Sequence, residues 1–205
     1  MNVIIFGAAG KTGRLVVDKA LAAGDNVTVF VHESAAFPAG VRVIMGDAKD
    51  ASAVRNALTD QEAVIDTIGG KTPYKSTDLE TSVARNIINA MKSENVRRLI
   101  VISMMGIGDS ADNAPFWYEH MLMPTFLHGS TKDKTEMESA VNASGVEFII
   151  ARPPLLSDSP ATGAIKQITG DTKGHKITRA DLAQFIVDQL ISDQYLNQAV
   201  VIANS

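Results

Sequence analysis

The chain has 205 residues and a formal net charge of -4, a length that suits one domain burying roughly 70% of the surface that its unfolded form exposes. The mildly acidic balance and the lack of a basic run predict no nucleic-acid partner. The absence of cysteine excludes disulfides, thiolate catalysis and cysteine-ligated metals, and four scattered histidines predict no metal site. The chain starts directly on an apolar run, and no apolar stretch reaches membrane-spanning length, so we expect a cytoplasmic protein without a membrane partner.

The first predicted strand, residues 2–6, leads into a glycine-rich turn and a helix over residues 14–24. The strand NVIIF is apolar on both faces, as in a strand covered on both sides. In GAAGKTG, Gly7 permits a tight turn, Gly10 lets a diphosphate approach the backbone, and Gly13 lets the helix pack closely. A helix start binds anions through its free N–H groups. A dinucleotide diphosphate is therefore expected to contact this turn, at Gly7, Ala9, Gly10, Lys11, Thr12 and Gly13.

The second predicted strand, residues 26–31, ends where we expect the residue that binds the adenosine ribose. A carboxylate at this point accepts from the 2′-hydroxyl of NAD, whereas a cation holds the 2′-phosphate of NADP. The chain offers both residue types, His32 and Glu33, with Lys11 close enough to help. Because successive strand residues face opposite sides, Glu33 is expected to point away from His32.

The third and fourth predicted strands, residues 41–45 and 63–68, continue the dinucleotide path. After the third strand, Asp47 either accepts from the adenine amino group or serves only as a turn residue, while Ala48 flanks the ring. Asp50 is a suitable N-cap for a helix over residues 50–58. At the end of the fourth strand, the backbone of Ile68 and Gly69 is expected to pass along the middle of the dinucleotide.

The rest of the chain keeps the alternation of strands and helices. A helix is predicted over residues 81–95, and further apolar runs predict strands over 98–103, 147–151 and 199–203. This pattern predicts an α/β fold with a doubly wound, mostly parallel sheet and helices on both faces, in a single domain over residues 1–205. Two segments break the pattern, residues 104–130 and 157–178. Both follow strand carboxyl ends, where such sheets bind ligands, so the first either packs as an excursion or forms a wall of a substrate pocket.

Several motifs resemble the atypical short-chain dehydrogenase/reductases, and most of all the flavin reductase/biliverdin reductase B group. They are GAAGKTG (7–13), GDAKD (46–50), the serine that ends the strand over 98–103, SGVEFIIARPPLLSDSPATG (144–163) and KITRADLAQFIV (176–187). The resemblance covers nearly the whole chain. It implies a Rossmann-like fold, a nicotinamide cofactor and hydride delivery to flavins or linear tetrapyrroles. Apart from the resemblance, Pro153 and Pro154 either shape the loop beside the nicotinamide, with Leu155 and Leu156 forming an apolar floor, or only end their strand.

Two departures from the family pattern bear on the cofactor and the chemistry. His32 stands where the group has an arginine for the 2′-phosphate, and a histidine is only partly charged near neutral pH. NADP is the favoured cofactor, with NAD or dual use as the alternative. In the family register the catalytic lysine falls at Lys134, but the tyrosine position holds Ser130. Lys134 is expected to bind the nicotinamide ribose or to be a solvated helix lysine, and Ser103 either lines the site or only ends its strand.

The missing phenol favours some acceptors over others. Ketone reduction benefits from a positioned proton donor, whereas a flavin or bilin can take its proton from water. The sequence therefore predicts an NAD(P)H-dependent reductase of a planar acceptor, such as a flavin used as substrate, a biliverdin-like tetrapyrrole or a quinone, in a monomer or homodimer. The alternative is a non-catalytic NADP(H) sensor of the NmrA-like type, and a nucleotide-sugar epimerase has less support.

Overall fold

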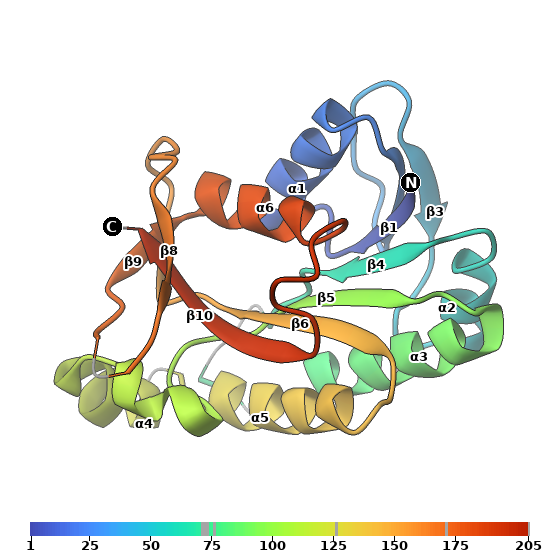
Figure 1. Ribbon diagram of the computed structural model, residues 1–205. Helices are drawn as coiled ribbons and strands as arrows, with labels where there is room; N and C mark the ends of the chain where they lie inside the picture. The colour runs from blue at the N-terminus through green and yellow to red at the C-terminus, as the bar shows by residue number, and fades with distance from the viewer. Residues whose placement is uncertain (71–73, 76, 126, 171, 205) are drawn as a thin grey trace.

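A mostly parallel sheet forms the centre of the fold (Figure 1). The computed structural model describes residues 1–70, 74–75, 77–125, 127–170 and 172–204. Within them the strand order of the large sheet is β3-β2-β1-β4-β5-β6-β10-β8, and all neighbours are parallel except β10 and β8. Its strands are β1 (Asn2–Phe6), β2 (Asn26–Val31), β3 (Arg42–Met45), β4 (Ala63–Asp66), β5 (Arg98–Ile102), β6 (Glu147–Arg152), β8 (Ile165–Ile168) and β10 (Gln198–Asn204).

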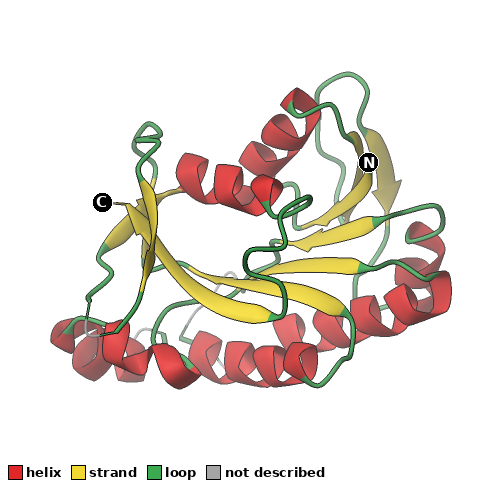
Figure 2. Cartoon of the chain, viewed as in Figure 1, coloured by secondary structure: helices red, strands yellow, loops and turns green. Residues whose placement is uncertain are grey.

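Helices cover both faces of this sheet, as Figure 2 shows. On one face, α1 and α6 pack against each other over a core that includes Ile5 and Ile149; on the other, α2, α3 and α5 cover a core that includes Ile4 and Val64. The helices are α1 (Lys11–Ala22), α2 (Ala51–Ala57), α3 (Leu79–Glu94), α4 (Met123–Thr125), α5 (His128–Asn142) and α6 (Arg179–Asp188), with a 3-10 segment η1 (Gly108–Asn113) and a π-helical turn η2 (Tyr118–Leu122). The predicted doubly wound α/β fold is confirmed.

Local signals set most element ends. The Asp50 carboxylate caps α2 by accepting from the N–H groups of Ser52 and Ala53, as predicted. Gly24 follows α1 with a φ of 85°, which ends that helix without strain. The predicted limits of α1 are wrong at its start, because the helix begins at Lys11. The extended backbone of Gly10 forms its N-cap.

The strand order creates a crevice at the carboxyl edge of the sheet. β1 pairs with β2 on one side and β4 on the other. The chain leaves β1 towards α1 on one face and leaves β4 towards α3 on the opposite face. In open α/β sheets, ligands bind where successive connections diverge in this way. The turn at residues 7–13 and the segment after Asp66 flank this crevice.

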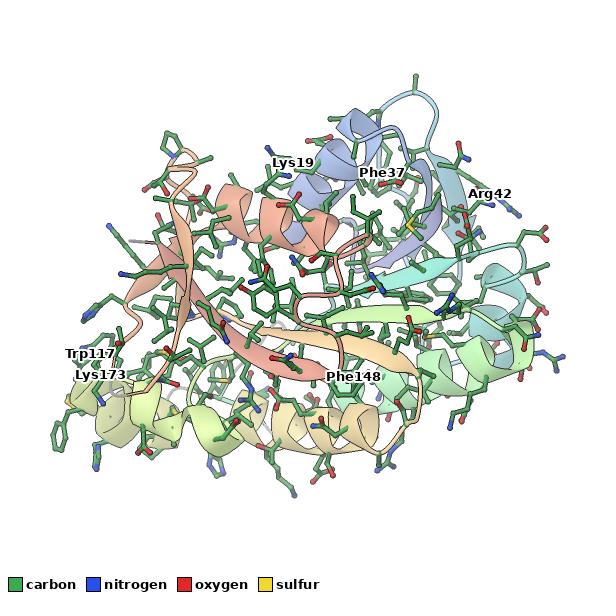
Figure 3. The ribbon with its side chains drawn as sticks, viewed as in Figure 1. Lys19, Phe37, Arg42, Trp117, Phe148 and Lys173 are labelled. Atoms are coloured by element: carbon green, nitrogen blue, oxygen red, sulfur yellow. The ribbon has the colours of Figure 1, made fainter. Side chains whose placement is uncertain are left out.

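The two irregular segments meet at one end of the molecule. The Asn113 side chain donates to the carbonyl oxygens of Gly170 and Thr172 at 2.7 and 3.1 Å, and Lys173 Nζ donates to the carbonyl oxygen of Asp112. Trp117 and Lys173 both lie at this end in Figure 3. A short parallel pair, β7 (Leu155–Ser157) and β9 (Lys176–Thr178), continues the second segment. Phe126, Asp171 and Ser205 lie outside the described residues.

Asp181, in the first turn of α6, ties this helix to the second irregular segment. Its buried carboxylate accepts from the backbone N–H groups of Thr162 and Gly163 at 2.9 and 3.0 Å, from the Thr178 hydroxyl at 2.9 Å and from the Asn204 amide at 2.7 Å. Burial alone would raise the pKa of Asp181, but these hydrogen bonds outweigh it and hold the pKa far below its usual range.

We expect Asp181→Asn to lower the free energy of unfolding by about 1–3 kcal/mol near neutral pH, because the amide accepts fewer of these bonds. A lowered folded-state pKa gives stability that is present above the unfolded pKa, about 4, and is lost as pH falls below it. The gap between wild type and variant should therefore shrink in acid, which urea unfolding at several pH values measures. A gap that stays constant down to strong acid would contradict this account.

Candidate functional site

The glycine turn brings three parts of the backbone into close contact. Gly7 has a φ of 73°, and a Cβ at this position would lie 2.7 Å from Thr67 Oγ1 and 2.8 Å from the backbone N of Ile68. A Cβ on Gly13 would meet the Gly7 carbonyl oxygen and lie 2.8 Å from Ala8 Cα. Only glycine fits either position, so the turn holds the end of β1, the first turn of α1 and the end of β4 together.

The start of α1 is open to an anion. Its N-cap, Gly10, has no side chain to cap the helix, and the first turn contains no acidic residue. Ala9, Gly10 and Lys11 are exposed, and Thr12 is half-buried. Helix N–H groups without a side-chain acceptor, together with the positive end of the helix dipole, suit a diphosphate.

Lys11 forms an ion pair with Asp158 from the segment that follows β7. The Lys11 Nζ to Asp158 Oδ2 distance is 2.9 Å, and the same carboxylate also pairs with Arg179 at the start of α6. The hydrogen bond from Lys11, together with the charge of Arg179, holds the pKa of the exposed Asp158 carboxyl below its usual range. The second irregular segment therefore reaches the edge of the glycine turn.

At the adenosine end, His32 and Glu33 lie just past the end of β2. Their side chains pair, with His32 Nε2 3.1 Å from Glu33 Oε1, and both are exposed. The expectation that Glu33 points away from His32 is wrong, because the strand alternation stops at Val31. The Asp47 carboxylate accepts the N–H of Lys49 at 2.8 Å, and the carbonyl oxygen of Ala48 accepts from Asn86 at 3.0 Å. Asp47 therefore makes a turn hydrogen bond while its carboxylate stays exposed after β3, and its contact with adenine stays a prediction.

The end of β4 holds a buried carboxyl that sequence reasoning missed. Asp66 is 3% exposed and accepts the N–H of Ile68 at 2.9 Å, which turns the chain out of the sheet two residues before the predicted end. Burial raises the pKa of Asp66 to about 7; the Glu80 carboxylate adds to the rise, while the Ile68 N–H and the Lys134 ammonium oppose it. Ile68 is half-buried and Gly69 exposed after this turn.

Lys134 lies at the carboxyl end of β5, as the family register implies. Its Nζ is 2.9 Å from Glu80 Oε2 of α3 and donates to the Ile102 carbonyl oxygen at 3.3 Å. It is therefore not a solvated helix lysine. Ser103, the next residue after β5, is 3% exposed, and within the described residues its Oγ has no hydrogen-bond partner. Sequence reasoning also missed Glu80 as the charge partner of Lys134. An acidic residue in the first turn of a helix, as Glu80 is in α3, is a signal that could have drawn attention to it.

At the position where the family register places the tyrosine, α5 carries Ser130. Ser130 precedes Lys134 by one helical turn on α5, so the two share a helix face. Tyr118, in the π-helical turn η2, is 3% exposed in a cluster with Met104 and Met105. Burial raises the pKa of the Tyr118 phenol to about 12.

The segment after β6 separates the two leucines of the expected apolar floor. Pro153 is buried, and its carbonyl oxygen accepts the N–H of Met105 at 3.0 Å, which joins this segment to the end of β5. Leu155 is 41% exposed, whereas Leu156 packs against the core beneath α1 and α6. Adjacent residues of β7 face opposite ways, so the expectation that Leu155 and Leu156 form one apolar floor is wrong.

A surface pocket of about 470 Å³ lies between the first irregular segment and the first turns of α5. It is lined by Gly106, Met123, Pro124, His128, Thr131 and Lys132. Gly106 lies three residues beyond Ser103, and Lys132 lies on the helix that carries Lys134. The first irregular segment therefore both packs as a small apolar cluster and forms a pocket wall.

Three features fit a dinucleotide diphosphate: the open start of α1, a glycine cradle that a Cβ would fill, and a switch point in the strand order. Together they define an NAD(P)-binding Rossmann domain. The chain belongs to the family described as NAD(P)H-binding, whose profile matches residues 7–193. Among the described residues, no group of histidine and acidic side chains is arranged to hold a metal ion, and no helix is long and apolar enough to cross a membrane.

Relatives and solved structures agree with this assignment. UPF0659 protein YMR090W of Saccharomyces cerevisiae is 23% identical over 93% of this chain and 87% of its own length. ChuY of Escherichia coli O157:H7, described as an anaerobilin reductase, superposes with a TM-score of 0.80 and 26% identity over 100% of this chain and 97% of its own. A short-chain dehydrogenase/reductase of Veillonella parvula in complex with NADP has a TM-score of 0.83 and 18% identity, over 99% and 94%. The Rossmann-like, NAD(P)-binding domain that the resemblance implied is confirmed.

We expect Gly13→Ala to lower the free energy of unfolding by roughly 1–3 kcal/mol, because its methyl group meets the backbone of Gly7 and Ala8. The displaced turn should also bind NADPH at least an order of magnitude more weakly, measured by NADPH fluorescence. Gly70→Ala is the matched stability control, since its methyl group would have no neighbour within 4 Å. Equal stability of the two variants would contradict the packing argument.

Asp66→Asn should stabilise the protein in mild alkali. A raised folded-state pKa gives stability that is fully present below the unfolded pKa, about 4, and is lost as pH rises through about 7. The neutral amide avoids the loss, so the variant should gain on wild type between pH 5.5 and pH 8, as measured by urea unfolding. Asp181→Asn provides the control, since its pH dependence lies in acid. A variant that is less stable than wild type at pH 8 would refute the assignment.

Proposed function

We propose that this protein is an NAD(P)H-dependent reductase that transfers hydride to a planar conjugated acceptor, with FMN as the representative substrate. The observation that carries the proposal is the pairing of a glycine-lined dinucleotide cradle with a lysine whose partner position, where the family register places a tyrosine, holds Ser130. Ser130 occupies the turn before Lys134 on α5, and Tyr118 is buried elsewhere. Such a site binds and orients a nicotinamide but offers no tyrosine proton donor to a ketone oxygen.

In this proposal each predicted residue has a defined task. The turn at residues 7–13 holds the diphosphate, while Asp47, Ala48, Ile68 and Gly69 line the path of the dinucleotide. Lys134, held by Glu80, binds the nicotinamide ribose, and Ser103 and Pro153 line the nicotinamide. Bound NAD(P)H supplies the hydride. The protein orients the acceptor. The reduced acceptor takes the matching proton from water, since its conjugated ring spreads the negative charge that it receives with the hydride.

The related structures support this class of reaction. ChuY is described as an anaerobilin reductase, and its acceptor is thus of the linear tetrapyrrole kind. The Veillonella parvula enzyme was solved with NADP, which favours NADP over NAD for this chain. Neither description favours the alternative of a non-catalytic sensor. A single domain over residues 1–205, a cytoplasmic location and a monomeric or homodimeric state stay predictions.

We place the acceptor in the pocket beside Gly106 and Lys132. The pocket combines apolar surface from Met123 and Pro124 with two basic side chains, His128 and Lys132. Apolar walls suit a flat ring, and the cation suits an anionic arm such as the phosphate of FMN. Riboflavin carries the same ring without that arm.

Purified protein should oxidise NADPH in the presence of FMN under anaerobic conditions, with bleaching of the flavin absorbance. FMN should have a lower KM than riboflavin, because only FMN carries a phosphate. If neither flavins, linear tetrapyrroles nor quinones support NADPH oxidation by the protein, the proposal is wrong. Tight NADP binding without such turnover would favour the sensor.

In the same assay Lys132→Gln should raise the KM for FMN by roughly 1.5- to fivefold and leave the KM for riboflavin unchanged, since one exposed charge pair contributes about 0.2–1 kcal/mol. Lys92→Gln, an exposed lysine in the last turn of α3, is the matched control. An equal effect of Lys132→Gln on both flavins would place the acceptor elsewhere.

A further inference from the structure

Arg14 spans the gap between the glycine turn and the loop after β2. It lies in the first turns of α1, one residue beyond Gly13. Its Nε donates to the Ala9 carbonyl oxygen at 3.3 Å, and its Nη1 donates to the Ala36 carbonyl oxygen at 3.1 Å. The guanidinium carbon lies 5.6 Å from the centroid of the Phe37 ring. Figure 3 shows Phe37 beside α1.

These contacts orient the guanidinium without neutralising it. Backbone carbonyl oxygens and an aromatic face carry no net charge, and in the described part of the chain no carboxylate pairs with Arg14. Among the described residues, the Nη2 group donates to neither carbonyl oxygen, which leaves its two N–H groups able to donate to a ligand. The side chain is exposed, so an anion in solution can reach it.

Five other cations along this edge of the sheet are matched by a carboxylate. Lys11 and Arg179 share Asp158, Lys49 is 2.7 Å from Asp78, and Lys134 is 2.9 Å from Glu80. His32 pairs with Glu33 at 3.1 Å, so that pair has a net charge of zero at best and of -1 when the imidazole is neutral. Such a pair does not attract a phosphate dianion. Within the part of the chain that the structure describes, Arg14 is a cation at the adenosine end that lacks this compensation.

We propose that Arg14, and not His32, holds the 2′-phosphate of NADP and gives the chain its preference for NADP over NAD. This inference rests on the proposed function only in taking NAD(P) as the ligand. The ribose of a dinucleotide whose diphosphate lies on the turn at residues 7–13 points towards the end of β2, and Arg14 stands between these two places. A planar guanidinium held by Phe37 and two carbonyl oxygens presents paired N–H donors to a phosphate, which an ammonium cannot do.

The test uses adenosine 2′,5′-bisphosphate and 5′-AMP, two probes that differ only in the 2′-phosphate and need no hydride transfer. Calorimetry should show that wild type prefers the bisphosphate. Arg14→Gln should weaken bisphosphate binding by roughly tenfold to a hundredfold, the usual range for a lost charge-assisted bond, and leave 5′-AMP binding within about twofold. Arg14→Lys should fall in between. Arg42→Gln, an exposed arginine on β3 far from α1 in Figure 3, is the matched control.

A second measurement needs no variant. If Arg14 holds the phosphate, the wild-type preference for the bisphosphate should persist from pH 7 to pH 9, because the guanidinium stays charged and the phosphate is a dianion throughout. A preference that falls across this range would instead assign the phosphate to a group that loses its charge there, such as an imidazole.

Three results would overturn the proposal. The first is a wild type that binds both probes equally, or neither. The second is an Arg14→Gln protein that loses both probes to the same degree, which would make Arg14 a brace for the loop and nothing more. The third is a preference that disappears by pH 9. Failure of flavin reduction would leave these binding results untouched, so the two proposals fail separately.

Discussion

The close approach of main chain to main chain at the glycine turn is the constraint on which the rest of the site depends. Gly13 packs on the backbone of Gly7 and Ala8, and Gly7 packs on Thr67 and Ile68. A single Cβ at either glycine would push apart β1, α1 and the end of β4. These contacts set where the N-terminus of α1 stands relative to the carboxyl ends of β4 and β5. The distance between a diphosphate on the turn and a nicotinamide near Lys134 is therefore set by backbone sterics, before any side chain contributes.

Most buried charged side chains around this turn and the sheet have an oppositely charged or hydrogen-bonding partner. Arg152 and Glu138, both buried, lie 2.6 Å apart between β6 and α5, and the buried Asp133 carboxylate accepts the N–H groups of Glu80 and Thr81 at the start of α3. Removing either partner of such a pair leaves an uncompensated charge at a cost of several kcal/mol, so the walls around Lys134 are held in one arrangement. Asp66 is the exception inside the core, and its raised pKa is the consequence. Arg14 is the exception at the surface, and its exposure lets it keep its charge without a carboxylate.

The fold could be predicted from sequence because its signals are local. Two-sided apolar runs marked the parallel strands, Asp50 and Gly24 marked helix ends, and the glycine spacing marked the turn. Contacts between distant segments left no such mark. The pairing of Lys11 with Asp158 joins residues 147 positions apart, and the partnership of Glu80 with Lys134 crosses from α3 to α5. Asp66 did leave a signal, since a carboxylate that ends an apolar run is unusual, but its burial depends on the helices that later cover it. The roles assigned to the site residues stay predictions.

The serine at the position of the family's tyrosine changes which contacts select the substrate. Where a tyrosine donates a proton, an alcohol or ketone oxygen must sit within hydrogen-bond reach of it, and that single contact selects the substrate. With Ser130 in that place, the acceptor has to stabilise the incoming electron pair through its own conjugation. Selection then depends on the shape and charge of the surface that holds the ring. Under the proposed function, that surface belongs to the segment after β5 and the first turns of α5, where Met123, Pro124, His128 and Lys132 line one pocket. Acceptor choice in relatives should therefore follow changes in this segment, while the glycine turn stays as it is.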